Sequence, residues 1–265
     1  NVASGSLDLL TGDEVITAFE HETFASFPKG NYTASSPVIS YWNTFFQGLR
    51  QCYIFLENVD KVPDLTESVK TDYIAQVKFL IAYYHYQLAR CYGPIILIRE
   101  LPDVNASQAE YLPRTSYDEC VDWICNLLDE AASSLPAIRT NKEDYGLATS
   151  VGAKAVKAKM LLYAASPLFN GNSSFYSNFT DKSGSQLMPL TYDPNKWVKA
   201  KTAIKEAIDL AEQNGHALYV KQDYKIGNED ANPYPAAGPV RCLRTSLVDW
   251  DSRNPEVILA ETRGE

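Results

Sequence analysis

The chain has 265 residues, of which 45% are hydrophobic, and it carries a formal net charge of −9 at pH 7. This composition is ordinary for a globular protein. An acidic chain without a Lys/Arg cluster lacks the basic surface that binding to a phosphate backbone requires, so nucleic acid is not expected as a partner. No apolar run approaches the roughly 18 residues that a membrane-spanning helix needs.

The first predicted elements are an irregular segment and a helix. Residues 1–35 are rich in Gly, Ser, Thr and Asn and have no sustained apolar period. Ser36 and Pro37 are the residue types favoured at an N-cap and at the first helical position. Apolar residues then recur every three or four positions until about Val62, which predicts a helix. Its predicted inward stripe is Tyr41, Phe45, Leu49, Cys52, Leu56 and Val59.

A second helix is predicted to start at a box-like pair, Asp64 and Glu67. It stops at Gly93-Pro94, because glycine tolerates the left-handed cap conformation and proline cannot continue a helix. Two helices joined by a short turn are predicted to pack as a pair. The predicted inward stripe of the second helix is Tyr73, Val77, Leu80, Tyr84, Leu88 and Cys91.

Three more helices follow a short extended run at 95–101. The third begins at a Ser116/Glu119 capping box. The fourth, Val151 to Ala165, is rich in alanine, which permits close helix approach. The fifth has Asp193 as its cap. Its predicted inward residues are Trp197, Ala200, Ile204, Ile208 and Ala211; those of the third are Val121, Ile124, Leu128, Ala131 and Leu135.

From about residue 216 the helical period disappears, and Glu256–Ala260 is predicted to form one short strand. The predicted fold is an all-α core of tetratricopeptide-like stacked helix pairs with loop-rich, irregular flanks. Its parts are an irregular segment at 1–35, a helical-pair core at 36–215 and an irregular loop and strand segment at 216–265.

The sequence contains no motif with a catalytic mechanism. It lacks a Gly-x-Ser-x-Gly elbow, a phosphate-binding glycine-rich loop with Lys, and a His-Glu-x-x-His pair. The three histidines are scattered, and the five cysteines lack zinc-ligand spacing. We therefore expect a protein that is not an enzyme, with no cofactor, no metal site and mostly buried, unpaired thiols.

The chain is rich in aromatic residues, with 17 Tyr, 10 Phe and 4 Trp. Those that lie in polar loops say more about function than those on the predicted helices. A flat ring covers the apolar face of a sugar, while Asn, Asp or Arg side chains bind its hydroxyls. A third loop group, Phe169, Phe175, Tyr176 and Phe179, is explained at least as well by packing onto the helices. The predicted ligand-binding residues are Phe27, Asn31, Tyr32, Tyr234, Arg244 and Trp250.

Four phrases in the sequence resemble, in this order, those of the SusD/RagB family. The phrase Leu161-Leu162-Tyr163-Ala164-Ala165-Ser166-Pro167-Leu168-Phe169-Asn170-Gly171 is the most diagnostic. Each phrase alone has a structural explanation, such as a helix stop at Tyr-Gly-Pro, but their common order is specific. The other three are Tyr41-Trp42 followed by Leu56-Glu57-Asn58, Ala75 to Tyr86 running into Tyr92 to Ile98, and Asn254 to Ile258.

The resemblance implies non-catalytic capture of an oligosaccharide or polysaccharide at the bacterial cell surface. It also implies delivery to a TonB-dependent outer-membrane transporter of the SusC type, and a location on the extracellular face of the outer membrane with a lipid anchor in the full-length protein. Because family members are longer, the chain is expected to be a fragment that lacks the N-terminus and the C-terminal half. The family's use of loop aromatics for glycan binding agrees in position with the residues named above.

Two other function classes stay open from the sequence. A helical-repeat scaffold that binds a peptide or protein partner would use a helix-lined groove rather than loop aromatics. A glycoside hydrolase would need two carboxylates at a defined separation, which a sequence does not supply. Released reducing ends after incubation with polysaccharides would identify the hydrolase.

Overall fold

The structure is a computed structural model that describes residues 23–33, 35–103, 105, 112–220, 239, 242, 246 and 254–260. The chain divides into two compact units, Asn1–Phe46 and Gln47–Glu265. Within the described ranges the regular structure is helical, and the only β pairing is an isolated bridge between Thr180 and Gln186. None of the helices in these ranges combines the length and the apolarity that crossing a bilayer requires.

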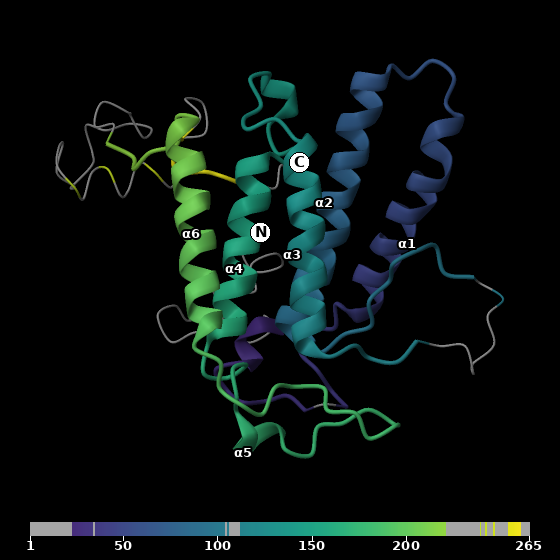
Figure 1. The fold of residues 1–265 in the computed structure, drawn as a ribbon, viewed down its shortest axis with the longest axis vertical. Helices are drawn as coiled ribbons and strands as arrows, with labels where there is room; N and C mark the ends of the chain where they lie inside the picture. The colour runs from purple at the N-terminus through teal and green to yellow at the C-terminus, as the bar shows by residue number, and fades with distance from the viewer. Residues whose placement is uncertain are drawn as a thin grey trace. The chain divides into compact units, whose positions relative to one another are not determined.

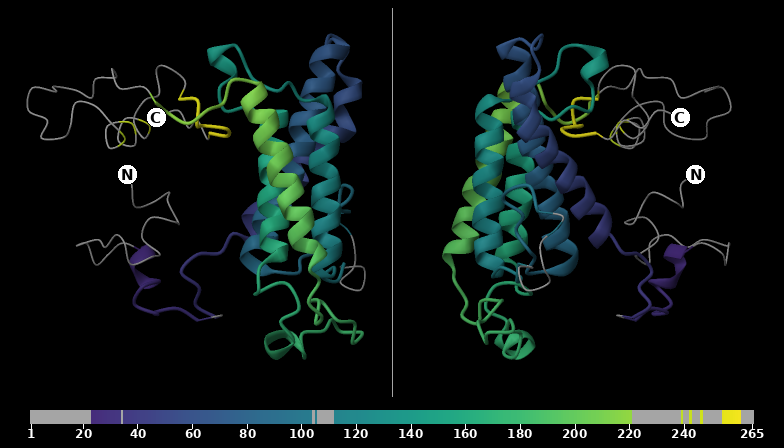
Figure 2. Two further views of the ribbon diagram at one scale, coloured as in Figure 1. Left: turned by 60° about the vertical axis from the view of Figure 1, so that its left-hand side comes forward. Right: turned by 90° about the vertical axis from the view of Figure 1, so that its right-hand side faces the viewer.

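Five long helices make up most of the regular structure in the described ranges. In the second unit, α2, α3, α4 and α6 run side by side in sequence order, each antiparallel to the next (Figure 1). Figure 2 shows the same four helices from two further sides. This arrangement confirms the predicted all-α core of stacked, tetratricopeptide-like helix pairs. The bounds are α1 Trp42–Asn58, α2 Glu67–Tyr92, α3 Tyr117–Ser134, α4 Ser150–Ala165, the short α5 Ser173–Tyr176, α6 Asn195–Gln213, and the 3-10 turns η1 Thr23–Ser26, η2 Val59–Lys61 and η4 Lys142–Asp144.

Helix α3 has the inward stripe that its sequence predicts. Ile124, Leu128 and Ala131 are fully buried, and Val121 and Leu135 are nearly so. Burying a large aliphatic side chain contributes about 1.5–3 kcal/mol, so this single stripe fixes the orientation of α3 between α2 and α4.

The predicted start of the first helix is wrong. Ser36 lies in a turn, where its backbone N–H bonds to the backbone oxygen and the Oγ1 of Thr33, at 3.2 and 3.0 Å. Its polar groups thus close a local turn instead of capping a helix. Helix α1 begins at Trp42, and its early hydrogen bond joins the N–H of Phe45 to the carbonyl of Tyr41.

The buried face of α2 also differs from the prediction. Tyr73 is 45% exposed and Cys91 is exposed, and the N-cap is Thr66 rather than Asp64. Apolar and aromatic residues occur on every side of this 26-residue helix, so several stripes fit its sequence and the neighbouring helices select one. The stop at Gly93 is confirmed, with φ +70°. The buried residues of α2 are Ala75, Phe79, Ile81, Ala82, His85, Tyr86, Leu88 and Ala89.

Helix α6 packs through its alanines rather than its large residues. Trp197 and Ile208, predicted to point inward, are 41% and 48% exposed. Ala203 and Ala207 instead form a small cluster with Ala158 of α4. Small side chains allow two helix backbones to approach closely, and that contact turns the larger side chains of α6 to the flanks. The buried residues of α6 are Ala200, Ala203, Ala207 and Ala211.

Two smaller predictions fail for identifiable reasons. The Ser116 side chain makes no cap hydrogen bond, and Glu119 accepts one from Arg99 at 2.6 Å instead of closing a capping box. Residues 254–260 form turns and bends rather than a strand. Their backbone bonds locally and to residue 217, and the described residues supply no neighbouring strand that would satisfy a β ladder.

Buried His85 ties the segment after α2 to that helix. Its Nδ1 lies 2.7 Å from the carbonyl oxygen of Ile81, and its Nε2 lies 3.1 Å from the N–H nitrogen of Ile98. A carbonyl only accepts and an N–H only donates, so the ring is neutral with its proton on Nδ1. Burial lowers the pKa of His85 from 6.5 to about 4.

An ion pair and several hydrogen bonds attach the connection between α3 and α4 to helix α2. Arg139 makes a two-pronged ion pair with Asp72, at 2.7 and 2.9 Å, and also donates to the carbonyl of Ala148. Gln76 bonds both the N–H and the carbonyl of Ala148, each at 2.8 Å. These contacts fix the position of the residues between α3 and α4.

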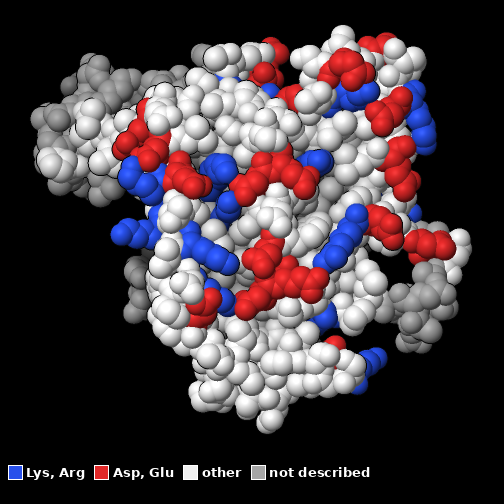
Figure 3. Space-filling view, viewed as in Figure 1, with Lys and Arg blue, Asp and Glu red and all other residues white. Residues whose placement is uncertain are grey.

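Many charged side chains on the helical face lie next to side chains of the opposite charge. Asp129 accepts hydrogen bonds from Lys154 and Lys157, each at 2.6 Å, and Lys196 pairs with Asp118. Figure 3 shows Lys and Arg interspersed with Asp and Glu over the face in view. Such a mixed surface offers no extended basic footprint there for an anionic polymer.

Removing the side-chain hydroxyl should affect the free energy of unfolding differently at two buried tyrosines. The Tyr117 hydroxyl is buried without a hydrogen-bond partner, whereas the Tyr53 hydroxyl donates to the carbonyl of Ile98. We expect Tyr117→Phe to leave the free energy of unfolding unchanged or to raise it by up to about 1 kcal/mol, and Tyr53→Phe to lower it by about 1 kcal/mol. Urea unfolding followed by circular dichroism measures both; a larger loss in Tyr117→Phe than in Tyr53→Phe would contradict this assignment.

Candidate functional site

A short turn before α1 brings together the three described members of the predicted site. The N–H of Gly30 bonds to the carbonyl of Phe27, and the N–H of Asn31 bonds to the carbonyl of Ser26, each at 3.0 Å. Gly30 has φ +66°, a conformation that glycine adopts without strain. The result is a tight reversal, here called the aromatic turn, consisting of Phe27, Asn31 and Tyr32 with the residues between them.

The aromatic turn presents two rings with an amide between them in sequence. The ring centroids of Phe27 and Tyr32 lie 5.2 Å apart, with their planes tilted by 57°. Tyr32 is 50% exposed, Phe27 is half-buried and Asn31 is exposed. Phe27 thus packs against a half-exposed Tyr32 ring, and the exposed Asn31 amide can donate and accept hydrogen bonds. This pairing of a flat apolar surface with an amide suits a sugar ring.

The other three predicted residues, Tyr234, Arg244 and Trp250, lie outside the described residues. Their participation in the site stays a prediction.

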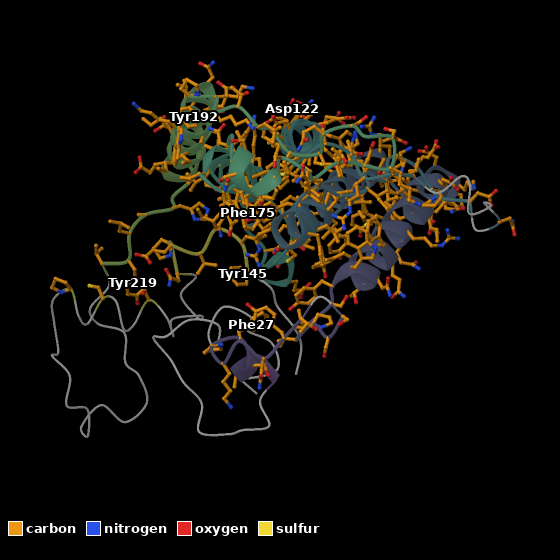
Figure 4. The ribbon with its side chains drawn as sticks, turned by 90° about the horizontal axis from the view of Figure 1, so that it is seen from below. Phe27, Asp122, Tyr145, Phe175, Tyr192 and Tyr219 are labelled. Carbon is orange, nitrogen blue, oxygen red and sulfur yellow. The ribbon has the colours of Figure 1, made fainter. Side chains whose placement is uncertain are left out.

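The aromatic residues of the loop between α4 and α6 divide between two roles. Phe169 is buried and stacks on Tyr117, with centroids 4.8 Å apart and planes at 9°, so it belongs to the core. Phe175, labelled in Figure 4, is 73% exposed, and its ring is nearly perpendicular to that of Tyr176, with centroids 5.1 Å apart. The packing explanation therefore holds for Phe169 but does not account for Phe175.

A cavity of about 230 Å³ lies within the second unit and was not anticipated from the sequence. It is here called the Tyr145 pocket, and Tyr145 is labelled in Figure 4. Three separate segments line it, which is why no local sequence signal reveals it: residues 138–149, the turn at 214–216 and residues 254–260. Glycines with positive φ, Gly146 and Gly215, turn the chain at two of these walls.

The buried cysteine thiols of the core are poorly reactive. Cys52, Cys120 and Cys125 are buried thiols, as predicted, whereas Cys91 is exposed. Burial raises the pKa of Cys52 and Cys120 to about 11 and that of Cys125 to about 12, which keeps these thiols protonated and poorly nucleophilic at neutral pH. In the part of the chain that the structure describes, no group of three or more His, Cys, Asp or Glu side chains is placed to hold a metal ion.

The chain is similar to a known protein family and to several solved structures. Residues 14–162, more than half of the chain, match the SusD-like family described as starch-binding and associating with the outer membrane. The solved structure of BT4246 is 38% identical, with a TM-score of 0.72 over 76% of this chain and 35% of that chain. No curated protein sequence matches significantly.

Two more distant structures share the fold. A SusD homolog from Bacteroides thetaiotaomicron is 19% identical, with a TM-score of 0.56 over 75% of this chain and 34% of that chain. A SusD-like carbohydrate-binding protein from Bacteroides fragilis is also 19% identical, with a TM-score of 0.54 over 77% and 33%. The chain thus spans about a third of the length of the solved structures that it matches. The family match over most of the helical core, together with the fold and the order of the four sequence phrases, identifies the chain as a member of the SusD-like family.

Proposed function

We propose that this protein captures an oligosaccharide at the bacterial cell surface without cleaving it and passes it to a TonB-dependent outer-membrane transporter of the SusC type. The family match supports the carbohydrate part of this proposal, since the family is described as starch-binding and outer-membrane-associated. Attachment to the extracellular face through a lipid anchor in the full-length protein is part of the same proposal.

The observation that carries the proposal is the aromatic turn. Phe27 and Tyr32 form a ring pair, with Asn31 next to Tyr32 in the sequence, in the first compact unit. An exposed Tyr32 face can desolvate the apolar side of a sugar ring, and ring pairs of this kind contribute on the order of 1 kcal/mol each. Tyr234, Arg244 and Trp250 would add a second platform.

Weak binding is sufficient for such a role. When a captured glycan is already held next to a transporter, the transporter's own site meets it at a high effective concentration. A dissociation constant in the micromolar to millimolar range, roughly −4 to −8 kcal/mol, would therefore support uptake while still permitting release.

Substitutions in the aromatic turn test the site directly. We expect Tyr32→Ala to weaken binding of the captured oligosaccharide about tenfold, roughly 1.4 kcal/mol, because the stacking face is lost. The melting temperature should change little, since half of the Tyr32 side chain is already in solvent. Isothermal calorimetry with oligosaccharides from a polysaccharide panel that includes starch measures the affinity.

The matched control is Phe175→Ala, which removes an exposed aromatic from a different loop, one that is more exposed than Tyr32 (73% against 50%), and should leave the affinity unchanged. Equal affinities of wild type and Tyr32→Ala would remove the aromatic turn from the site. Reducing ends released from the same polysaccharides would instead support the glycoside hydrolase.

A further inference from the structure

We propose that the Tyr145 pocket is a second binding site, which accepts a single uncharged sugar ring. The proposal rests on the proposed function only for the class of ligand; the pocket itself belongs to the second unit and shares no residue with the aromatic turn.

The size of the pocket suits one ring rather than a chain. Its volume is about 230 Å³. Sites for drug-sized ligands are commonly about 300–1,000 Å³, so a pocket of this size encloses a single ring more readily than a whole oligosaccharide. The half-buried Tyr145 provides an aromatic surface, and Ile138, Val257 and Leu259 add aliphatic wall.

The charge of the pocket favours a neutral ligand. Arg139 is its cationic residue, but Asp72 engages both terminal nitrogens of the guanidinium, and the Ala148 carbonyl accepts from Nε and Nη2. An anionic ligand would have to compete with this ion pair, which is largely shielded from solvent with the Arg139 side chain 12% exposed. Hydroxyl groups need no such competition.

His216 supplies a polar atom that suits a hydroxyl group. Its Nδ1 lies 3.0 Å from the carbonyl oxygen of Pro255, which can only accept, so Nδ1 carries the proton. In the neutral ring this leaves Nε2 as the acceptor of a residue that lines this pocket and a neighbouring one. A sugar hydroxyl can donate to that nitrogen while the adjacent ring stacks against Tyr145.

Asn254 and its neighbours keep this wall in place. The buried Asn254 side chain donates to the carbonyl of Ser246 and accepts from the N–H of Glu256 at 2.9 Å. The N–H of Ala217 bonds to the carbonyl of Pro255 at 3.3 Å. Since each end of the Asn254 amide makes a hydrogen bond, Asn254 positions the wall.

Saturation-transfer difference NMR on the chain of residues 1–265 tests the pocket, with methyl glucoside, methyl galactoside and methyl mannoside as neutral probes and glucuronate as the charged one. We expect a neutral glycoside to bind in the millimolar range and glucuronate to bind at least fivefold more weakly. Tyr145→Ala should reduce the affinity for the glycoside about tenfold, and Tyr145→Phe, which keeps the ring, should stay within about twofold.

His216→Asn is the sharper variant, because the asparagine amide can replace Nδ1–H as donor to Pro255 while Nε2 is removed. We expect about a fivefold loss of affinity with an unchanged melting temperature. The proposal is overturned if no neutral glycoside shows saturation transfer, if glucuronate binds as tightly, or if Tyr145→Ala and His216→Asn bind like wild type. A double variant, Phe27→Ala with Tyr32→Ala, should keep glycoside binding in the pocket, so loss of polysaccharide binding in that variant alone concerns the proposed function and not this pocket.

Discussion

Gly171→Ala is expected to lower the free energy of unfolding by about 3 kcal/mol. Gly171 has φ +80°, and a Cβ built there would lie 2.3 Å from the backbone nitrogen of Tyr192 and 2.6 Å from its Cα. The two chain segments are held at this distance by Asn170, whose side chain bonds both the N–H and the carbonyl of Asp193, at 2.9 and 2.8 Å. A methyl group must therefore displace backbone, which cannot move without breaking those bonds.

Gly184→Ala is the matched control for this substitution. Gly184 lies in the same loop with φ +87°, but nothing lies within 4 Å of its added Cβ. Its substitution should lower the free energy of unfolding by only about 1–2 kcal/mol, because alanine is strained in the left-handed backbone conformation. Urea unfolding of both variants separates the steric contribution from the conformational one; equal losses would show that the contact between Gly171 and Tyr192 is not close in solution.

Acid should destabilise the protein through His85 over a defined pH range. The folded-state pKa of His85 is lowered to about 4, while the unfolded chain takes up the proton near 6.5. The neutral ring therefore contributes its full stabilisation above pH 6.5, and this contribution is lost as the pH falls from 6.5 towards 4. A difference of about 2.5 pH units corresponds to about 3 kcal/mol at most.

The His85→Gln variant isolates this effect, because glutamine does not titrate. We expect the variant to be less stable at pH 7, since the bonds to Ile81 and Ile98 are impaired. Between pH 7 and pH 4.5, however, wild type should lose about 2–3 kcal/mol more than the variant, because the carboxyl groups titrate alike in both. Parallel curves of unfolding free energy against pH would rule out a neutral, buried His85 as the cause.

The contrast among three helices shows which part of the fold is predictable from sequence. Helix α3 has one apolar stripe, and that stripe is the buried face. Helix α2 is apolar or aromatic on several sides, and α6 has both an alanine stripe and a large-residue stripe. Their sequences establish that they are helices but leave the inward face open, and contacts with neighbouring helices decide it. For α6, close approach to α4 selects Ala203 and Ala207 over Trp197.

The candidate sites differ in the same way. The aromatic turn is formed within six consecutive residues, so Phe27, Asn31 and Tyr32 could be proposed together from their spacing and polar surroundings. The Tyr145 pocket joins residues about 70 and 110 positions apart along the chain, and the tautomer of His216 becomes identifiable only through the hydrogen bond that Nδ1 makes. Neither feature has a local pattern, so in the sequence His216 is only one of three scattered histidines.

Affinity electrophoresis is the most direct test of glycan capture by the aromatic turn. The chain is run in native gels that contain starch or another neutral polysaccharide, and its mobility is compared with that in a gel without polysaccharide. We predict that at least one polysaccharide retards the wild-type chain, and that the double variant Phe27→Ala with Tyr32→Ala migrates in that gel almost as it does without polysaccharide. Unchanged wild-type mobility in every gel, or equal retardation of the double variant, would contradict the account.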